Sequence, residues 1–231
     1  MFPFQEPLSI EAELSLPSDQ VLAKIWNLLT PERRQRIEQV VGSRCFSNVV
    51  VLENIYDRGN ASAVMRSAEA FGFGRVHMIE LGEKFKESQR TTAGADKWVE
   101  IQKWKSTKTC VDELKSQGKQ IVVTHLSADS KPIADIDFTR PTALVLGNEK
   151  EGISQEMITA ADHRVIVPME GFVQSFNISV AGALCFYQMY IQRRSLLGRQ
   201  GDLSEDEQKL LKAVYAMRTL DSAVDILKAS S

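Results

Sequence analysis

The stretch Asn48–Glu53, NVVVLE, decides the expected fold. Three consecutive valines favour a β-strand, and an apolar run without alternation is typical of a strand buried on both faces. Similar short runs follow at 75–79, 120–124, 142–146 and 164–167, and helical patterns occur at 60–71, 107–117 and 154–161. Strands that alternate with helices predict an α/β fold, with a mostly parallel sheet covered by helices on both faces.

Helical patterns without strands flank this region. The first 17 residues contain three prolines and predict an irregular arm, and a helical pattern begins at Ser18. Thr30 and Pro31 form the N-cap and N1 pair of a second helix that ends near Arg44. Two more helical patterns cover 175–197 and 204–228. We therefore expect an N-terminal arm and basic helical extension over 1–46, an α/β domain over 47–199, and a C-terminal helical extension over 200–231.

The composition excludes several classes of protein. Of the 231 residues, 43% are hydrophobic and 25% are charged, which is typical of a soluble globular protein. No apolar run approaches the ~20 residues of a membrane span. The first 17 residues include no basic residue, so neither a secretory signal nor a transit peptide is expected, and a cytoplasmic location is. The three cysteines and three histidines are scattered, so we expect no metal site.

Several nucleotide-binding and hydrolytic motifs fail on inspection. The segment 147–152, GNEKEG, has the glycine spacing of a phosphate loop, but Ile153 and Ser154 follow where such a loop requires Lys and then Ser or Thr. Gly72 and Gly74 come after a helical pattern and lack the third glycine of a dinucleotide-binding turn. No GxSxG nucleophile elbow is present.

Three polar segments remain, each at or after the end of a predicted strand. They are 54–66 (NIYDRGNASAVMR), 144–154 (LVLGNEKEGIS) and 167–181 (VPMEGFVQSFNISVA). Ligands bind at the carboxyl ends of the strands in α/β sheets, so these segments are candidates for one site. Taken singly, Asn60 and Asn177 could be helix caps, and Gly147 and Gly152 could be turn residues.

Together the three segments resemble the motifs of the SpoU/TrmH branch of the SPOUT methyltransferases. The first resembles N-x-x-A-x-x-R, with Asn60, Ala63 and Arg66; the second resembles G-x-E-x-x-G, with Gly147, Glu149 and Gly152. The third resembles I-P-M-x-G-x-x-x-S-L-N-x-S-x-A, matched at Pro168, Met169, Gly171, Ser175, Asn177, Ser179 and Ala181. It departs from that pattern at Val167 and Phe176, which are both apolar. The segment 92–99 also resembles a loop of the family, and the likeness covers roughly residues 31–199.

The resemblance implies an S-adenosylmethionine-dependent methyltransferase that acts on the ribose 2′-hydroxyl of RNA. It implies that Arg66 is the central catalytic residue and that Asn60, Glu149 and Asn177 orient the groups around it. The implied cofactor-binding residues are Thr124, Leu146, Gly147, Asn148, Val167, Met169, Ser175 and Phe176. It further implies a C-terminal trefoil knot and a homodimer, and the small residues Ser179, Ala181, Gly182 and Ala183 place the dimer interface on the helix after Asn177.

A basic helical N-terminal segment, a core and a C-terminal helix resemble the arrangement of the family's tRNA enzymes, which implies a tRNA substrate methylated at a guanosine of the D-loop. Ribosomal-RNA relatives more often carry a small N-terminal α/β domain, and the 47 residues before the first strand are too few for one. Although the net charge is −2, arginines cluster locally, and we predict RNA contacts for Arg33, Arg34, Arg36 and Arg193. The alternatives are a solvated helix surface at these arginines, an rRNA substrate, a catalytically silent RNA-binding relative, and a nucleotide-binding α/β enzyme of unrelated chemistry.

Overall fold

The computed structural model describes residues 1–81 and 94–229. Residues 92 and 93, the start of the fourth family-like segment, lie outside the described residues. Contacts divide the chain into two compact units: one is Met1–Arg44 with Gly201–Ser231, and the other is Cys45–Gln200. Each unit is described by itself below.

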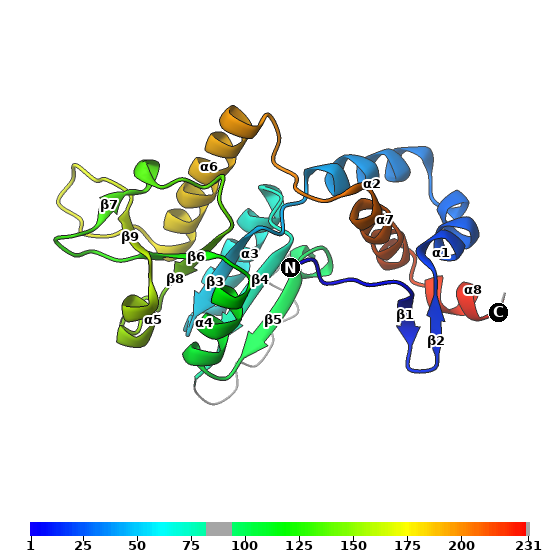
Figure 1. The fold of residues 1–231 in the computed structure, drawn as a ribbon, viewed down its shortest axis with the longest axis horizontal. Helices are drawn as coiled ribbons and strands as arrows, with labels where there is room; N and C mark the ends of the chain where they lie inside the picture. Colours follow the sequence, from blue (N-terminus) through cyan, green and yellow to red (C-terminus); the bar gives the residue numbers. More distant parts are fainter. Residues whose placement is uncertain (82–93, 230–231) are drawn as a thin grey trace. The chain divides into compact units, whose positions relative to one another are not determined.

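The unit Cys45–Gln200 is built on a seven-stranded sheet of order β5-β4-β3-β8-β6-β9-β7 (Figure 1). The strands are β3 (Asn48–Glu53), β4 (Arg75–Ile79), β5 (Glu100–Trp104), β6 (Gln120–Thr124), β7 (Lys131–Pro132), β8 (Thr142–Leu146) and β9 (His163–Ile166). The pairings between these strands are all parallel. Every residue of β3 is buried, as the run of valines predicts.

Helices cover both faces of this sheet because successive strand residues point to opposite sides. Val50 and Leu52 of β3 belong to one apolar cluster, which α3 (Arg58–Ala70) and α6 (Ile178–Leu197) complete. Val49 and Val51 belong to the other, which α4 (Thr107–Ser116) and α5 (Gln155–Ala160) complete. The short helices η2 (Ala95–Lys97) and η3 (Ile133–Asp135) complete the unit. The predicted α/β class, with helices on both faces of a parallel sheet, is confirmed.

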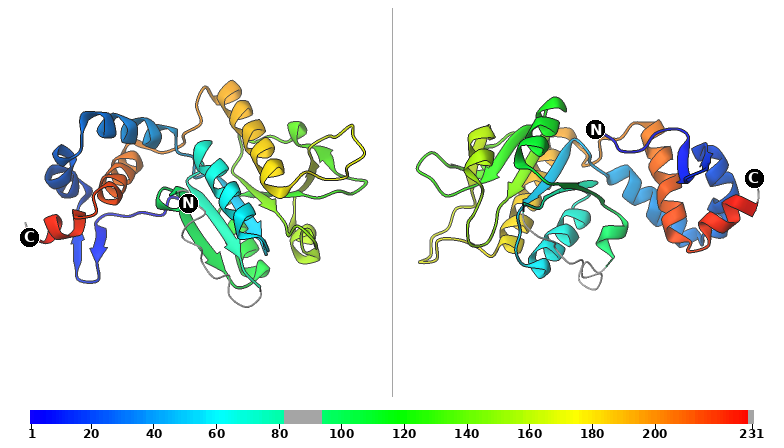
Figure 2. Two further views of the ribbon diagram at one scale, coloured as in Figure 1. Left: turned by 180° about the vertical axis from the view of Figure 1, so that it is seen from behind. Right: turned by 90° about the horizontal axis from the view of Figure 1, so that it is seen from below.

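The second unit is largely helical (Figure 2). It contains the hairpin β1 (Leu8–Glu11) and β2 (Leu14–Leu16), then α1 (Ser18–Ile25), η1 (Trp26–Leu28), α2 (Pro31–Ser43), α7 (Glu205–Thr219) and α8 (Ala223–Ala229). Thr30 caps α2 as predicted, because its hydroxyl accepts a hydrogen bond from the Arg33 amide at 3.3 Å. The α7 helix packs against both α1 and α2.

Two expectations for this unit are wrong. The arm that the prolines predicted to be irregular contains the β1–β2 hairpin. The single helix expected over 204–228 is interrupted between Thr219 and Ala223. Arg44, which follows α2, is 1% exposed and donates a hydrogen bond from Nε to the Tyr215 hydroxyl at 2.9 Å. None of the described helices is long and apolar enough to cross a membrane.

Candidate active site

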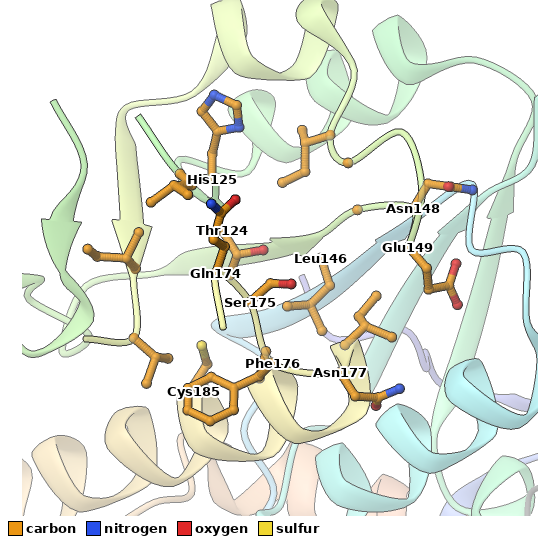
Figure 3. A pocket seen from close by; sticks show the side chains of 18 of the residues that line it. Thr124, His125, Leu146, Asn148, Glu149, Gln174, Ser175, Phe176, Asn177 and Cys185 are labelled. Atoms are coloured by element: carbon orange, nitrogen blue, oxygen red, sulfur yellow. The ribbon is translucent and has the colours of Figure 1, made fainter. Parts of the chain in front are cut away.

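A cavity of about 610 Å³ lies at the carboxyl ends of β6, β8 and β9. Its walls come from the segments that follow these strands and from the start of α6, which follows the segment after β9 (Figure 3). All eight residues that the resemblance assigned to the cofactor line this cavity: Thr124, Leu146, Gly147, Asn148, Val167, Met169, Ser175 and Phe176. The volume falls within the ~300–1,000 Å³ typical of small-molecule sites. The structure therefore gathers the predicted residues around one ligand-sized space.

Asn148 shapes the wall of this cavity with its polar groups. Its backbone N–H and C=O exchange hydrogen bonds with Gly152 at 2.8 and 2.9 Å. Its side-chain Oδ1 accepts from the Lys150 and Glu151 amides, and its Nδ2 donates to the Asn54 carbonyl at 2.6 Å. Asn148 therefore fixes the loop over 147–152, and its backbone N–H is engaged within that loop.

Gly147 is required by the close approach of this loop to itself. A Cβ at this position would lie 2.5 Å from the Gly152 carbonyl carbon and 2.5 Å from Ile153 Cγ1. The contact with Gly152 is with backbone, which cannot move aside as a flexible side chain can. Gly152 itself has φ +72°, in the left-handed region that favours glycine. Both glycines thus have a steric role in the wall of the cavity.

Glu149 joins two of the three family-like motifs at the edge of the cavity. Its Oε1 accepts a hydrogen bond from Asn60 Nδ2 at 2.9 Å and from the Asp57 amide at 3.3 Å, and its Oε2 accepts from the Tyr56 amide at 3.1 Å. Asn177 Nδ2 adds the third motif by donating to Asn60 Oδ1 at 3.2 Å. In Figure 3, Glu149 and Asn177 lie on the same side of the cavity, across from Thr124. Three of the four predicted catalytic residues therefore form one connected network.

The helix caps are only partly those considered from the sequence. Asp57 caps α3, because its Oδ1 accepts from the Gly59 and Asn60 amides at 2.6 and 3.3 Å. The Asn60 side chain is therefore free of that role and bonds to the other motifs. Asn177 does cap α6 by accepting from the Ser179 amide at 2.9 Å, while its amide nitrogen reaches Asn60. A capping role and a place in the network coexist at Asn177.

Arg66 stands apart from this network. It is six residues after Asn60 on α3, which at 3.6 residues per turn places it on a different face of the helix. The side chain is exposed and does not line the cavity. Within residues 1–81 and 94–229, no hydrogen bond or ion pair engages its guanidinium. The structure of one chain does not bring Arg66 together with the other three predicted catalytic residues.

Sequence reasoning missed Glu53, the last residue of β3. This carboxylate is 2% exposed, and its Oε1 accepts from Thr107 Oγ1 at 2.9 Å and from Ser154 Oγ at 2.7 Å. Its Oε2 accepts from the Ser154 amide at 2.9 Å. Glu53 thus anchors the end of the 147–154 segment to the central strand. The signal in the sequence was a lone acid closing an otherwise apolar strand, where burial demands hydrogen-bond donors.

The four arginines predicted to bind RNA are not equivalent. Arg33 and Arg36 of α2 are exposed, and Arg34 is half-buried and donates to Asn27 Oδ1 at 3.1 Å. Arg193 of α6 is only 2% exposed, and its guanidinium donates to the Phe138 and Gln200 carbonyls at 3.2 Å each. A guanidinium buried to this extent cannot reach a phosphate, so the prediction for Arg193 is wrong.

The Glu149 network leads to a prediction about pH. Burial raises the pKa of Glu149, but hydrogen bonds from Asn60 and from backbone N–H groups outweigh it and hold the pKa below the ordinary value of 4.5. A lowered pKa stabilises the folded state above the ordinary value, and this contribution is lost as the pH falls through the lowered pKa. We expect the unfolding free energy of Glu149→Gln to fall below that of the wild type at pH 7, with the difference shrinking below pH 4.5.

Urea unfolding over a pH series measures this difference. Glu151→Gln is the matched control, because Glu151 lies in the same loop and its carboxylate has no hydrogen-bond partner among the described residues. A difference for Glu149→Gln that is independent of pH, or equal to that of the control, would show that the carboxylate does not hold the motifs together.

Comparison with known proteins agrees with this geometry. Residues 47–187 match the SpoU rRNA methylase family, so the chain belongs to that family. The tRNA (guanosine(18)-2′-O)-methyltransferase of Escherichia coli K12 is 37% identical over 186 residues, which are 79% of this chain and 81% of that enzyme. The Aquifex aeolicus enzyme of the same name is 35% identical over 188 residues, which are 80% of this chain and 89% of that enzyme.

Solved structures give the same result. The A. aeolicus TrmH/SpoU tRNA-modifying enzyme has a TM-score of 0.71 at 35% identity, covering 80% of this chain and 95% of that one. The SpoU methyltransferase AviRb from Streptomyces viridochromogenes, in complex with AdoMet, has a TM-score of 0.59 at 26% identity, covering 64% of this chain and 60% of that one.

Proposed function

We propose that this protein transfers a methyl group from S-adenosylmethionine to the 2′-hydroxyl of a guanosine ribose in tRNA. The observation that carries the proposal is the likeness, over about four-fifths of the chain, to tRNA (guanosine(18)-2′-O)-methyltransferases. The network of Asn60, Glu149 and Asn177 at the edge of a ligand-sized cavity supports it. A cytoplasmic location fits an enzyme that acts on tRNA.

The residues of the cavity fit S-adenosylmethionine. Leu146, Val167, Met169 and Ile178 offer apolar surface for the adenine and the methionine chain, and Gly147 lets the loop that forms one wall of the cavity pack closely on itself. The bound sulfonium supplies both the methyl group and the leaving group. What the protein supplies is a cavity that holds the cofactor in place and an aligned ribose hydroxyl.

Arg66 is proposed to position the substrate by binding a phosphate. A guanidinium keeps its proton and is therefore a poor general base, whereas Arg binds phosphate in a bidentate way. Its exposed position on α3, outside the cavity lining, suits a role that becomes effective when RNA or a second protomer is bound. Asn60, Glu149 and Asn177 then hold the edge of the cavity on which the ribose lies.

The finer architecture follows from the resemblance to the SPOUT enzymes. We propose that the segments following β8 and β9 form the trefoil knot that this family shares. We also propose that the region 47–199 is the methyltransferase domain, and that the extensions over 1–46 and 200–231 contribute affinity for RNA. The exposed arginines Arg33 and Arg36 on α2 support a contribution of the N-terminal extension to RNA affinity.

A homodimer through α6 is proposed on the exposed apolar residues of that helix. Val180, Leu184, Tyr187 and Ile191 are 46, 40, 53 and 41% exposed and recur at helical spacing along one side. The small residues are a weaker argument than the sequence suggested. A Cβ on Gly182 would lie 3.0 Å from Leu146 Cδ1, so this glycine serves packing within its own unit. Phe186 and Met189 are likewise buried in the core.

We expect sedimentation equilibrium at micromolar concentration to give twice the chain mass of 25.9 kDa. Leu184→Lys with Tyr187→Glu, two changes in the exposed row, should shift the protein toward the monomer because they place charges in an apolar interface. Leu196→Lys, at a 65% exposed position outside that row, is the control. A mass near 25.9 kDa for the unchanged protein would exclude the dimer.

Removing the charges of Arg33, Arg34 and Arg36 should weaken tRNA binding and flatten its salt dependence. Each phosphate contact releases condensed counterions, so losing three contacts reduces the slope of log K against log salt by about 2–3. The measurement is binding over a salt series. The control is a variant in which the same number of charges is removed outside α2, by changing Lys105, Lys108 and Lys115 together to Gln. An equal change in slope for both variants would show that the α2 arginines make no specific contact with tRNA.

The proposed function is tested by supplying the protein with radiolabelled S-adenosylmethionine and, in parallel, tRNA or ribosomal RNA. We expect label in tRNA and none in ribosomal RNA. Label in ribosomal RNA alone would show that the substrate is ribosomal RNA. Binding of S-adenosylhomocysteine and tRNA without any transfer would define a silent RNA-binding relative.

A further inference from the structure

Tyr56 is a solvent-exposed aromatic residue at the edge of the candidate active site. It belongs to the β3–α3 connection and is 74% exposed. The two tyrosines of α6 pack against Phe71, and the tyrosine of α7 is buried. An exposed single aromatic is ordinary on a protein surface. Tyr56 differs because its backbone is fixed to the active-site network.

Hydrogen bonds hold the backbone at Tyr56 itself and at Asn54. The Tyr56 amide donates to Glu149 Oε2 at 3.1 Å, and Glu149 lines the cavity. Asn54, two residues earlier, has φ +52°, which is unusual for a residue other than glycine, and its carbonyl accepts from Asn148 Nδ2 at 2.6 Å. Strained backbone held by specific partners is characteristic of functional positions. The ring is thus presented by a rigid turn.

A cation accompanies the ring. Lys150 Nζ lies 5.0 Å from the centroid of the Tyr56 ring, and Lys150 also lines the cavity. At this distance a cation–π interaction between the ammonium and the ring favours one orientation of the ring. The ammonium keeps its positive charge and can still contact a nearby phosphate. Lys150 lies over one face of this exposed ring, so a nucleobase would stack on the other. Aromatic rings and basic side chains together bind unstacked nucleobases in RNA.

We propose that Tyr56 is a stacking platform for a nucleobase of the RNA substrate, at or beside the nucleotide whose ribose is methylated, with Lys150 contacting the adjoining phosphate. This inference rests on the proposed function. It assigns to Tyr56 a positioning role in substrate binding, separate from the cofactor cavity. Because every base has a π-face, the platform contributes affinity and placement of the base without selecting one base.

The test compares Tyr56→Phe, Tyr56→Leu and Tyr56→Ala. The first keeps the ring, the second keeps apolar bulk without a π-face, and the third removes both. We expect Tyr56→Phe to keep the wild-type kcat/KM for tRNA, and the other two to lose about tenfold or more, mainly through KM. S-adenosylhomocysteine affinity, measured by calorimetry, should be unchanged in all three.

A spectroscopic arm reports stacking directly. A tRNA transcript carries 2-aminopurine in place of the guanosine that the wild-type enzyme methylates, and a second transcript carries it at the following nucleotide. We expect fluorescence in the complex to be quenched by wild type and Tyr56→Phe, and to be brighter with Tyr56→Leu and Tyr56→Ala, for at least one transcript.

Three outcomes would overturn the proposal. Wild-type kinetics in Tyr56→Leu would show that bulk alone suffices, weaker S-adenosylhomocysteine binding in Tyr56→Ala would show a structural role, and equal fluorescence for all proteins would exclude stacking. In each case transfer by the unchanged enzyme still supports the proposed function. Absence of transfer by the unchanged enzyme to any RNA would instead overturn the proposed function, and this inference with it.

Discussion

Arg66→Ala is expected to abolish methyl transfer while leaving the cavity intact. Removing a group that positions the reacting centre typically costs about 10²–10³-fold in turnover. The side chain is exposed and has no partner among residues 1–81 and 94–229, so its removal leaves no buried group unsatisfied. The unfolding midpoint and the affinity for S-adenosylhomocysteine should therefore stay at wild-type values.

Radiolabelled transfer and calorimetric titration, run on the same preparation, measure the two halves of this prediction. Arg66→Lys separates the possible roles, because Lys keeps the charge but not the bidentate geometry. Partial activity in Arg66→Lys with an unchanged pH profile indicates a phosphate clamp. Turnover of Arg66→Ala within about threefold of the wild type, under ~1 kcal/mol of barrier, would mean that the resemblance misassigns this residue.

Gly147→Ala is expected to destroy cofactor binding. The added methyl group would meet the Gly152 backbone at 2.5 Å, so the loop over 147–152 must shift. Overpacking of this kind costs about 1–3 kcal/mol, and the shift moves a wall of the cavity as well. We expect S-adenosylhomocysteine affinity to fall by about tenfold to a hundredfold or more, with a lower unfolding midpoint.

Gly171→Ala is the matched control for this effect. Gly171 lies in the third family-like motif, but a Cβ built there meets nothing within 4 Å. Calorimetry and thermal unfolding of both variants give the comparison. Equal affinities for Gly147→Ala and Gly171→Ala would show that the close approach to Gly152 does not shape the cofactor site.

The central sheet could be predicted because its strands are buried on both faces. Strands β3, β4, β6 and β8 have the predicted bounds, and β9 begins and ends one residue earlier than expected. β5 was missed: its sequence EIQKW alternates between partly exposed and exposed residues, as suits a strand at the sheet edge. β7 has two residues, one of them a proline, and no local pattern identifies so short an edge strand.

The site was predictable to the extent that motifs specify it. The resemblance named residues that now line one cavity, and no periodicity could have gathered them from separate segments spread over residues 124–176. Burial was not predictable from charge. Arg44 and Arg193 occur among exposed arginines in the sequence, yet Arg44 bonds to the Tyr215 hydroxyl and Arg193 to the Phe138 carbonyl, which lie 171 and 55 residues away along the chain. The contribution of Glu53 likewise depends on donors 54 and 101 residues away.

The chemical position of the transferred methyl group tests the account most directly. After transfer from labelled S-adenosylmethionine, the tRNA is hydrolysed with alkali, which cleaves RNA only where a free 2′-hydroxyl can attack the neighbouring phosphate. We predict that the label appears in alkali-stable dinucleotides and, after complete enzymatic digestion, as 2′-O-methylguanosine. Label released entirely as mononucleotides would place the methyl group on a base and contradict ribose methylation.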